Sequence, residues 1–383
     1  MAKQDRLFSP IKLGPATLSH RIVLAPLTRL RADKNHVQMD MCAEYYAQRA
    51  STPGTLLIAE ATIVSPRAGG MDNVPGIWST EHIAAWRKVT DAVHAKGSFI
   101  FLQLWDLGRR ASPEVLAREQ DGPHRVCGPS AIEVDGAPSA KYHALTVDEI
   151  QSRIQDFARG ARNAMSAGFD GVELHAANGY LVDSFLQECC NQRSDEYGGS
   201  IEGRSRFCID VIKALVDAVG DPRKVALRLS PWTFQQDNTP QTPISQFEHV
   251  ITELKDLGLA YLHLVESRTS GDPTNATYHR LTRRNDSLIE IWCSGKSPII
   301  LAGGFDYETA TVATSQIYAD KQMLVAIGRH YIANPDLVFR FKHRLPIIPY
   351  DRSTFYKAVS KDGYTDYPYS TEYQAAAKAG TVN

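Results

Sequence analysis

The chain has 383 residues, of which 43% are hydrophobic and 22% charged, and its formal net charge at pH 7 is −1. This composition indicates a globular protein with a sizeable core, and without clustered Lys and Arg it argues against a nucleic acid or an anionic membrane as partner. Because the N-terminus lacks the apolar run of a signal peptide and no apolar stretch reaches about 20 residues, we expect a cytoplasmic protein with no membrane partner.

Short apolar runs alternate along the chain with longer amphipathic segments. Ahead of the first run, residues 8–21 contain two short runs around Gly14-Pro15, which predict a hairpin that closes the floor of the fold. Most runs are continuously apolar, as in parallel strands that are buried on both faces. The predicted strands are Ile22–Leu24, Thr55–Ala61, Ser98–Trp105, Gly171–His175, Val225–Ser230, Tyr261–Val265, Pro298–Gly303 and Met323–Gly328.

The amphipathic segments between these runs predict helices. Residues 81–95 carry apolar side chains at helical spacing. Thr146 followed by Glu149 is a capping-box signature, so a helix should begin there and run toward Gly168. Further helices are predicted at 204–219, 245–257, 307–318 and 335–343.

About eight strand-then-helix units in succession predict an α/β protein with a (β/α)₈ TIM-barrel fold. A Rossmann domain is disfavoured because no G-x-G-x-x-G motif follows any predicted strand. The connection from Asp106 to Leu145, after the third strand, is too long for a simple turn, and we interpret it as an insertion at the barrel mouth. We therefore expect a single domain over residues 1–383.

The six cysteines are scattered and include no Cys-x-x-Cys pair. They predict neither a zinc site nor a disulfide framework, and buried or half-buried free thiols are the expected state. No metal site is predicted.

Polar residues follow several predicted strands at their C-terminal ends, where the chemistry of such barrels takes place. Each has an ordinary structural explanation when taken singly: His175 as a structural histidine, Arg228 as an ion-pair partner, and Gly303-Gly304 as a tight turn. Late loops that combine glycines with an arginine, here Gly328-Arg329, more specifically favour a phosphate site, because backbone N–H groups and a guanidinium both bind phosphate.

The motif His175-Ala-Ala-Asn178-Gly-Tyr180-Leu, followed by Asn-Gln-Arg-Ser-Asp-Glu-Tyr-Gly-Gly-Ser-Ile-Glu-Gly at 191–203 and Arg204, resembles the old yellow enzyme family of ene-reductases. The resemblance runs from about Phe8 to Pro368. Other motifs fit the same family in the same order: Ala25-Pro26-Leu27-Thr28, Gln103-Leu-Trp105, Arg228-Leu-Ser-Pro231, Gly328-Arg329, Asn334-Pro-Asp-Leu337 and Phe355-Tyr356.

The resemblance implies a non-covalent FMN over the barrel mouth, with NADPH (or NADH) as reductant. Thr28 would bond the flavin C4 carbonyl, Gln103 the pyrimidine edge, and Arg228 the N1–C2 end, where reduction places negative charge. Ala61 occupies a place where some members carry glycine, and it still lets the backbone approach the flavin. The residues implied for the cofactor are Pro26, Leu27, Thr28, Ala61, Gln103 and Arg228, with Gly303, Gly304, Gly328 and Arg329 at the phosphate.

The implied reaction is reduction of the activated C=C bond of an α,β-unsaturated carbonyl or nitro compound. His175 and Asn178 would bond the substrate carbonyl oxygen, and these bonds strengthen as charge develops there. Hydride would pass from the flavin N5 to the β-carbon, and Tyr180 would protonate the α-carbon as a general acid. Trp105 and Tyr356 would line the substrate cavity.

Alternatives remain open at this point. Another FMN barrel oxidoreductase would need a base for the substrate proton, and a flavin-free phosphate-binding aldolase or isomerase would need a strand-end Lys or Glu, for which Glu60 and Glu266 are candidates. A third alternative is a lapsed reductase that serves as a binding protein. We interpret Arg109-Arg110 as a solvated charge pair, with contact to the nucleotide or to an acidic substrate as the alternative. Residues 268–282 match no pattern of the family. The physiological substrate, the preference between NADPH and NADH, the choice between reduction and isomerisation, and a monomeric or homodimeric state stay undetermined.

Overall fold

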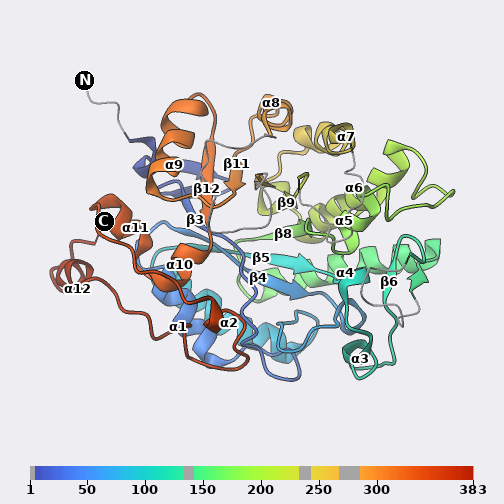
Figure 1. Ribbon diagram of the computed structural model, residues 1–383, viewed down its shortest axis with the longest axis horizontal. Coiled ribbons are helices and arrows are strands. Elements are labelled where there is room, and N and C mark those ends of the chain that lie inside the picture. Colours follow the sequence, from blue (N-terminus) through green and yellow to red (C-terminus); the bar gives the residue numbers. More distant parts are fainter. Residues whose placement is uncertain (1–4, 133–141, 233–242, 267–284, 383) are drawn as a thin grey trace.

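The computed structural model describes residues 5–132, 142–232, 243–266 and 285–382. Its centre is a closed barrel of eight parallel strands, shown in Figure 1 with the helices around it. This confirms the predicted TIM barrel, and each strand begins and ends within two residues of the predicted bounds. The strands are β3 (Ile22–Leu24), β4 (Leu56–Ile63), β5 (Phe99–Trp105), β8 (Gly171–Ala176), β9 (Val225–Leu229), β10 (Tyr261–Val265), β11 (Ile299–Ala302) and β12 (Met323–Ile327).

The floor of the barrel is closed by the predicted hairpin. Strands β1 (Ile11–Leu13) and β2 (Ala16–Leu18) pair antiparallel. Ile11, Leu13 and Leu18 pack into one buried cluster with inward-facing barrel residues such as Phe101 and Ala226. The barrel is therefore filled with apolar side chains at its N-terminal end.

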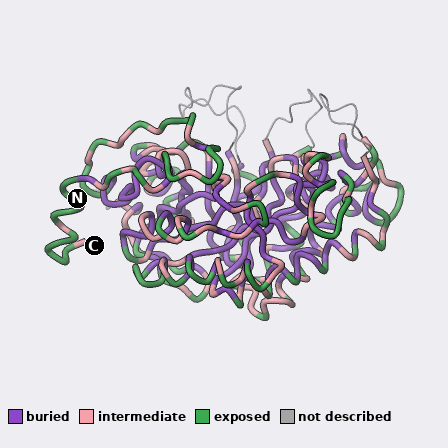
Figure 2. The backbone as a smooth tube through the Cα atoms, turned by 90° about the horizontal axis from the view of Figure 1, so that it is seen from below, coloured by how far each residue is buried: buried purple, intermediate pink, exposed green. Residues whose placement is uncertain are grey.

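Helices cover the outside of the barrel, and Figure 2 shows buried residues running through the interior with exposed residues on the outer elements. The capping box before α4 is confirmed: Thr146 Oγ1 accepts the Glu149 N–H at 3.2 Å, and Glu149 Oε2 accepts the Thr146 N–H at 2.8 Å. The predicted 307–318 helix continues as a π-helical turn over Ala313–Ile317. No helix in the described ranges is long and apolar enough to span a membrane. The main outer helices are α1 (Asp40–Arg49), α2 (Thr80–His94), α4 (Val147–Ser166), α6 (Ile201–Val219), α7 (Ile244–Leu254), α8 (Asp286–Ser294), α9 (Tyr307–Val312) and α11 (Leu337–Lys342).

The long connection after β5 contains short elements of its own. A 3₁₀ turn, η3 (Gly108–Arg110), is followed by α3 (Pro113–Leu116), and β6 (Cys127–Gly128) pairs with β7 (His143–Ala144). The buried Arg153 on α4 ties the start of this connection down, because its Nη1 donates to Asp106 Oδ2 at 2.7 Å.

The C-terminal segment crosses back over the N-terminal part of the barrel after α10 (Arg329–Ala333) and α11, and ends in α12 (Thr371–Lys378). Figure 1 shows this red segment beside the blue α1. Arg29 Nη2 donates to the Gly363 carbonyl at 2.7 Å, Arg31 Nε donates to the Ser360 carbonyl at 2.9 Å, and the Tyr45 and Tyr364 rings stack at 4.1 Å. Buried arginines near β3 therefore fix the segment that carries Tyr356.

Candidate active site at the C-terminal end of the barrel

The interior of the barrel changes from apolar to polar toward the C-terminal ends of its strands. Side chains alternate along a strand, so the residue two positions after an inward apolar residue also points inward. Phe101 is followed in this way by Gln103 on β5, and Ala226 by Arg228 on β9. The same alternation makes Glu173 and His175 on β8 share the interior.

The first polar layer is a buried hydrogen-bonded chain that joins three strands. Gln103 Nε2 donates to Glu173 Oε1 at 2.6 Å, and His263 Nδ1 lies 2.9 Å from Glu173 Oε2. These three side chains are at most 1% exposed. Burial by itself raises the pKa of Glu173, but His263, Arg228 and Gln103 outweigh burial and hold that pKa below its ordinary value. A carboxylate therefore sits beneath Arg228.

The next layer places His175 beside Arg228. The two residues are Cα partners in the β8–β9 ladder, and His263 is the partner of Arg228 on its other side. Burial, then Arg228 and then His263 lower the pKa of His175 far below its ordinary value. His175 is therefore a neutral imidazole, able to donate one N–H, and its buried Nδ1 has no hydrogen-bond partner among the described residues.

A strained turn follows β8 and carries the other two predicted catalytic residues. Asn178 and Gly179 both have left-handed backbone angles, with φ of 61° and 78°. The Asn178 N–H donates to Ser230 Oγ at 2.8 Å, and the Gly179 N–H donates to Asp183 Oδ2 at 2.7 Å. Asparagine tolerates this conformation better than most residues, so its presence here meets a backbone demand as well as a chemical one.

The turn brings the Tyr180 ring against two aromatic rings of the barrel end. Its centroid lies 5.0 Å from the His175 ring and 4.8 Å from the Trp105 ring, with edge-on geometry in both cases. Burial raises the pKa of Tyr180 above its ordinary value. Its phenol is therefore protonated at neutral pH and is available as a proton donor.

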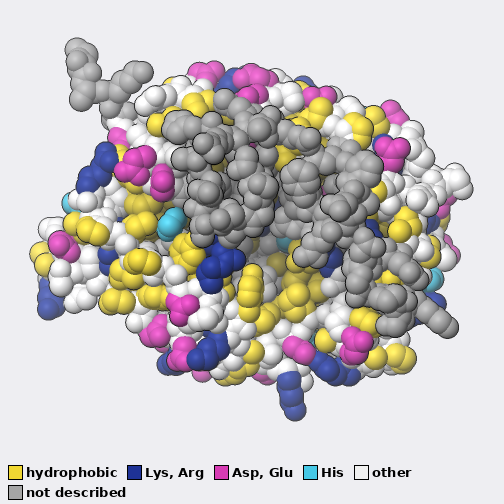
Figure 3. Space-filling model, viewed as in Figure 1, with side chains coloured by type: hydrophobic (Ala, Val, Ile, Leu, Met, Phe, Trp, Pro, Cys, Tyr) yellow, Lys and Arg dark blue, Asp and Glu magenta, His cyan; other side chains and the backbone are white. Residues whose placement is uncertain are grey.

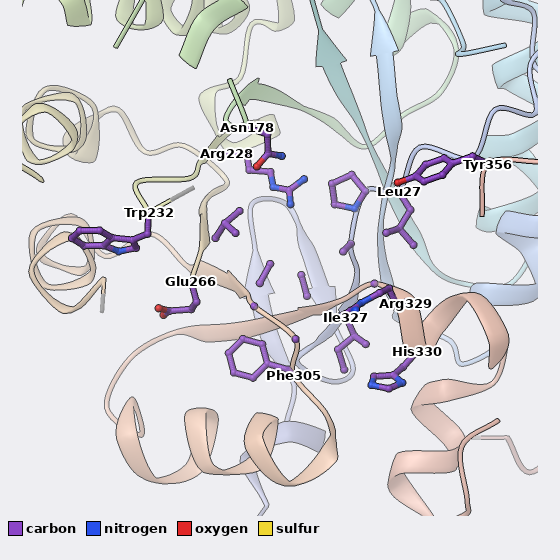
Figure 4. Close-up of a pocket in the computed structure, with 18 residues that line it drawn as sticks. Leu27, Asn178, Arg228, Trp232, Glu266, Phe305, Ile327, Arg329, His330 and Tyr356 are labelled. Carbon is purple, nitrogen blue, oxygen red and sulfur yellow. The ribbon is translucent and has the colours of Figure 1, made fainter. Parts of the chain in front are cut away.

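A cavity of about 530 Å³ opens beside these residues. In Figure 4, Arg228 and Arg329 extend toward the middle of the cavity, and the Tyr356 hydroxyl points inward from the right. Tyr356 is 65% exposed, so it stands at the rim. Of the predicted site residues, the cavity is lined by Pro26, Leu27, Asn178, Arg228, Gly303, Gly304, Gly328, Arg329 and Tyr356.

The other predicted residues do not line this cavity directly. His175, Tyr180 and Trp105 form the aromatic wall next to Asn178, and Gln103 lies in the polar layer below. Thr28 directly follows the cavity residues of the β3 loop, and the remaining residue, Ala61, is buried within β4. The structure thus brings together the strand ends that the sequence singled out.

Of the cavity residues that were not assigned to the site from the sequence, those with polar or aromatic side chains are Trp232, Glu266, Phe305 and His330. Trp232 follows β9 and its Nε1 donates to Asn285 Oδ1 at 2.7 Å, while Phe305 and His330 follow the glycines of the late loops. Glu266, considered in the sequence only for a flavin-free enzyme, also lines the cavity and is 3% exposed. All four lie within three residues of the C-terminal end of a barrel strand, and this position could have identified them.

The late loops form a cradle that larger residues would fill. A Cβ atom at Gly303 would lie 2.7 Å from Glu266 Cβ, one at Gly328 would lie 3.1 Å from Leu27 Cδ2, and Gly304 has a φ of 84°. Backbone N–H groups can therefore approach a ligand closely here. Buried Arg228 Nε has no partner within the described residues, which suits an anionic ligand group above the barrel. The site thus fits a phosphate-bearing flavin, and no cluster of metal-binding side chains occurs in the described ranges.

The interpretation of Arg109-Arg110 as a solvated pair is wrong. Arg109 is only 8% exposed and its Nη1 donates to Cys190 Sγ, while Arg110 is half-buried against the backbone of Gly179. Local sequence could not reveal this, because the burial arises from η3 packing on α5 (Leu181–Leu186). The cysteine prediction is confirmed: all six are free, and four are buried.

Comparison with known proteins assigns the family. Residues 6–347 match the model of the NADH:flavin oxidoreductase / NADH oxidase family. The chain belongs to this family, that of old yellow enzyme. Its fold superposes on the old yellow enzyme of Pichia sp. with a TM-score of 0.86 and 36% identity, covering 96% of this chain and 94% of that one. Morphinone reductase gives a TM-score of 0.84 and 37% identity, covering 97% and 98%.

Two curated members of the family are more similar in sequence. The chanoclavine-I aldehyde reductase fgaOx3 of Penicillium roqueforti is 49% identical over 98% of this chain and 99% of its own length. A protein of Epichloe festucae var. lolii named as a probable inactive reductase, easA, is also 49% identical, over 99% of both chains. Close similarity within the family therefore extends to proteins named as active and to proteins named as inactive.

Proposed function

We propose that this chain binds FMN non-covalently at the barrel mouth, accepts reducing equivalents from NADPH, and reduces the activated C=C bond of an α,β-unsaturated aldehyde or ketone. The observation that carries the proposal is the wall formed by His175, Asn178 and Tyr180 beside a cavity with Arg228 and a glycine cradle. Bound FMN would supply the hydride that adds to the β-carbon.

The residues of the proposed FMN site have distinct tasks. Arg329 with the backbone at Gly303, Gly304 and Gly328 would hold the phosphate, and Pro26, Leu27, Thr28 and Ala61 would contact the ring system. Arg228 would stabilise negative charge at the N1–C2 end, because a fixed cation in a buried site is not screened by water. One N–H of the Gln103 amide is used by the hydrogen bond to Glu173. The amide oxygen and the second N–H would bond the pyrimidine edge.

The substrate would bind through its carbonyl oxygen. Neutral His175 and the Asn178 amide would each donate a hydrogen bond to it, and these bonds would strengthen as negative charge builds there. Tyr180 would give its proton to the α-carbon, since its pKa keeps the phenol protonated at neutral pH. Trp105 and Tyr356 would confine the substrate.

The names of relatives narrow the proposed substrate and reductant. Two proteins of Penicillium roqueforti, 49% and 44% identical to this chain, are named as chanoclavine-I aldehyde reductases, and one of Cladobotryum is named as an aldehyde reductase. A 48% identical protein of Aspergillus flavus is named as an NADP-dependent oxidoreductase. We therefore propose an aldehyde substrate and NADPH as the reductant.

The relatives named as inactive raise a second candidate, a protein that binds the ligand without turnover. The presence of Tyr180 in the aromatic wall, next to His175, favours the reductase. The two candidates differ in a measurable way, because a binding protein would not be reoxidised by an enone.

The test is an anaerobic two-step spectrum. The purified protein should be yellow, should bleach with NADPH, and should regain its colour when 2-cyclohexenone is added. Tyr180→Phe should still bleach at the wild-type rate, but its reoxidation by the enone should slow by about 100-fold, the lower end of the roughly 10²–10⁴-fold that a general acid contributes. A yellow wild-type protein that ignores both the enone and an unsaturated aldehyde would refute the reductase and leave the binding protein. A colourless protein that cannot be loaded with FMN would refute the cofactor.

A further inference from the structure

Arg110 lies behind the turn that carries Asn178 and Tyr180. A Cβ atom at Gly179 would lie 2.6 Å from Arg110 Nε and 2.8 Å from Arg110 Nη2, so the guanidinium rests directly on the Gly179 backbone. The Gly179 N–H itself donates to Asp183 Oδ2 at 2.7 Å. The residue between the two proposed catalytic side chains is therefore held between a cation and a carboxyl group.

The backbone around Arg110 is fixed by contacts within the fold. Its 3₁₀ turn, η3, is anchored by the Gly108 N–H, which donates to Asp106 Oδ1 at 2.9 Å, and by the Leu181 N–H, which donates to the Asp106 carbonyl at 3.1 Å. Gly108 also packs so closely on Leu181 that a Cβ there would lie 2.8 Å from the Leu181 Cα. The buried Nε of Arg110 has no hydrogen-bond partner in the described part of the chain.

We propose that Arg110 is a positioning residue for Tyr180: its guanidinium fixes the turn at Gly179 and stabilises the phenolate that Tyr180 forms when its O–H bond breaks and the α-carbon gains the proton. The phenolate is reprotonated from solvent, so no other reactant is needed. This inference rests on the proposed function, in which Tyr180 is the proton donor.

The charged surroundings of Tyr180 agree with this role. Burial raises its pKa, and Arg110 is the strongest influence in the lowering direction, ahead of Arg228, while Tyr356 raises it. The other groups that face the ring are the neutral His175 of β8 and Trp105 of β5. Arg110 therefore makes Tyr180 a stronger acid than burial alone would leave it.

The test compares Arg110→Met and Arg110→Lys with the wild type. Anaerobically reduced protein is mixed with 2-cyclohexenone between about pH 7 and 11.5, a range that extends above the ordinary tyrosine pKa of about 10, and the rate constant for flavin reoxidation is measured. In Arg110→Met the pH at which this rate declines should rise by about one unit, and the rate at pH 7 should fall about 10-fold, because one pKa unit corresponds to a tenfold change in the equilibrium. In Arg110→Lys both the pH of the decline and the rate at pH 7 should lie close to the wild-type values, because lysine keeps the positive charge.

Two controls separate this proposal from simpler explanations. Arg118→Met removes a charge from the same connection, but Arg118 is exposed and paired with Asp72, so both readouts should stay at wild-type values. The rate of flavin reduction by NADPH should be unchanged in Arg110→Met. An unshifted pH profile, or a loss that appears only as a higher KM for carboxylate-bearing enones, would overturn the proposal in favour of packing or of substrate recognition.

A spectroscopic pH titration of Tyr180 tests the role of Arg110 without requiring that the protein reduce an enone. The absorbance change at 295 nm that is lost in Tyr180→Phe reports the phenolate of Tyr180 alone. Its midpoint should be higher in Arg110→Met than in the wild type, even if no enone reoxidises the protein. Equal midpoints would refute the role of Arg110, whereas a shifted midpoint without turnover would refute only the proposed reaction.

Discussion

At the scale of single residues, Asn178 shows how one side chain can meet two demands. Its backbone φ of 61° lies in the left-handed region, where a Cβ atom costs most residues roughly 1–2 kcal/mol. Its side chain lines the cavity beside Arg228, where an N–H donor suits a carbonyl oxygen. The turn is thus strained at the point where the proposed chemistry needs a donor.

Replacing Asn178 by Ala and by Gly separates these demands. Both variants lose the amide donor, so the rate constant for reoxidation by an enone should fall by roughly 100-fold, or about 3 kcal/mol. Asn178→Ala should also be less stable than Asn178→Gly, by about 1 kcal/mol, because only glycine adopts a positive φ without penalty. Stopped-flow kinetics and urea unfolding measure the two effects. A glycine variant with wild-type kinetics would contradict the assigned donor role.

At the scale of elements, the parallel ladder explains why polar groups from distant segments share one layer. The alternation on β5, β8 and β10 points Gln103, Glu173 and His263 inward, above an apolar floor that the hairpin closes. A buried carboxylate of this kind is stable only because its partners satisfy it. The layer therefore supports the proposed flavin-binding residues Gln103 and Arg228 from below.

Glu173→Gln should weaken this support. Glutamine has one acceptor oxygen in place of two and carries no charge opposite Arg228, so the free energy of unfolding at pH 7.5 should fall by about 2 kcal/mol, and FMN should be released more easily. The pKa of Glu173 is lowered by the fold, so its stabilising contribution exists above the unfolded pKa and is lost as the pH falls through the folded pKa. The difference from wild type should accordingly shrink below about pH 4.5.

Urea unfolding at pH 7.5 and pH 4, with FMN fluorescence as a second readout, measures this. Glu114→Gln serves as the control, because Glu114 is exposed and lies outside the barrel. If Glu173→Gln matched Glu114→Gln at pH 7.5 in both stability and FMN retention, the supporting role of the layer would be wrong.

At the scale of the whole molecule, the C-terminal segment completes the site from the other end of the chain. Arg31 donates to the carbonyls of Thr354, Phe355, Ser360 and Asp362, all within the segment that carries the exposed Tyr356. In Figure 3, acidic and basic side chains are scattered among one another on the visible face. Hydrogen bonds from the buried Arg31 therefore hold the segment against the barrel.

Arg31→Ala should release this segment. Four backbone carbonyls lose their donor at once, so the free energy of unfolding should fall by on the order of 3 kcal/mol. Hydrogen exchange should increase over residues 354–363, and the KM for the enone should rise more than kcat falls, because Tyr356 lies at the rim and not at the reacting atoms. Arg31→Lys, which keeps a donor, should show a smaller effect. Unchanged exchange over 354–363 in Arg31→Ala would show that other contacts hold the segment.

The barrel and the place of its site could be predicted from the amino-acid pattern. Runs such as Ile299–Ala302 and Met323–Ile327 are apolar throughout because strands of a closed parallel barrel are buried on both faces, so their pattern can be recognised without a structure. Polar residues directly after such runs, such as Asn178 and Arg329, marked the C-terminal end. The single-domain organisation and the roles of the individual site residues stay predictions.

The partner of each polar residue became known from the three-dimensional structure. The layer that joins Gln103, Glu173 and His263 depends on the register of neighbouring strands, and the burial of Arg109 and Arg110 depends on η3 packing against α5. The clamp of Arg31 on the C-terminal segment joins residues more than 300 positions apart. Local patterns record which face of an element is apolar, whereas partners across the chain are set by the closure of the barrel, and a single sequence does not contain that information in any one segment.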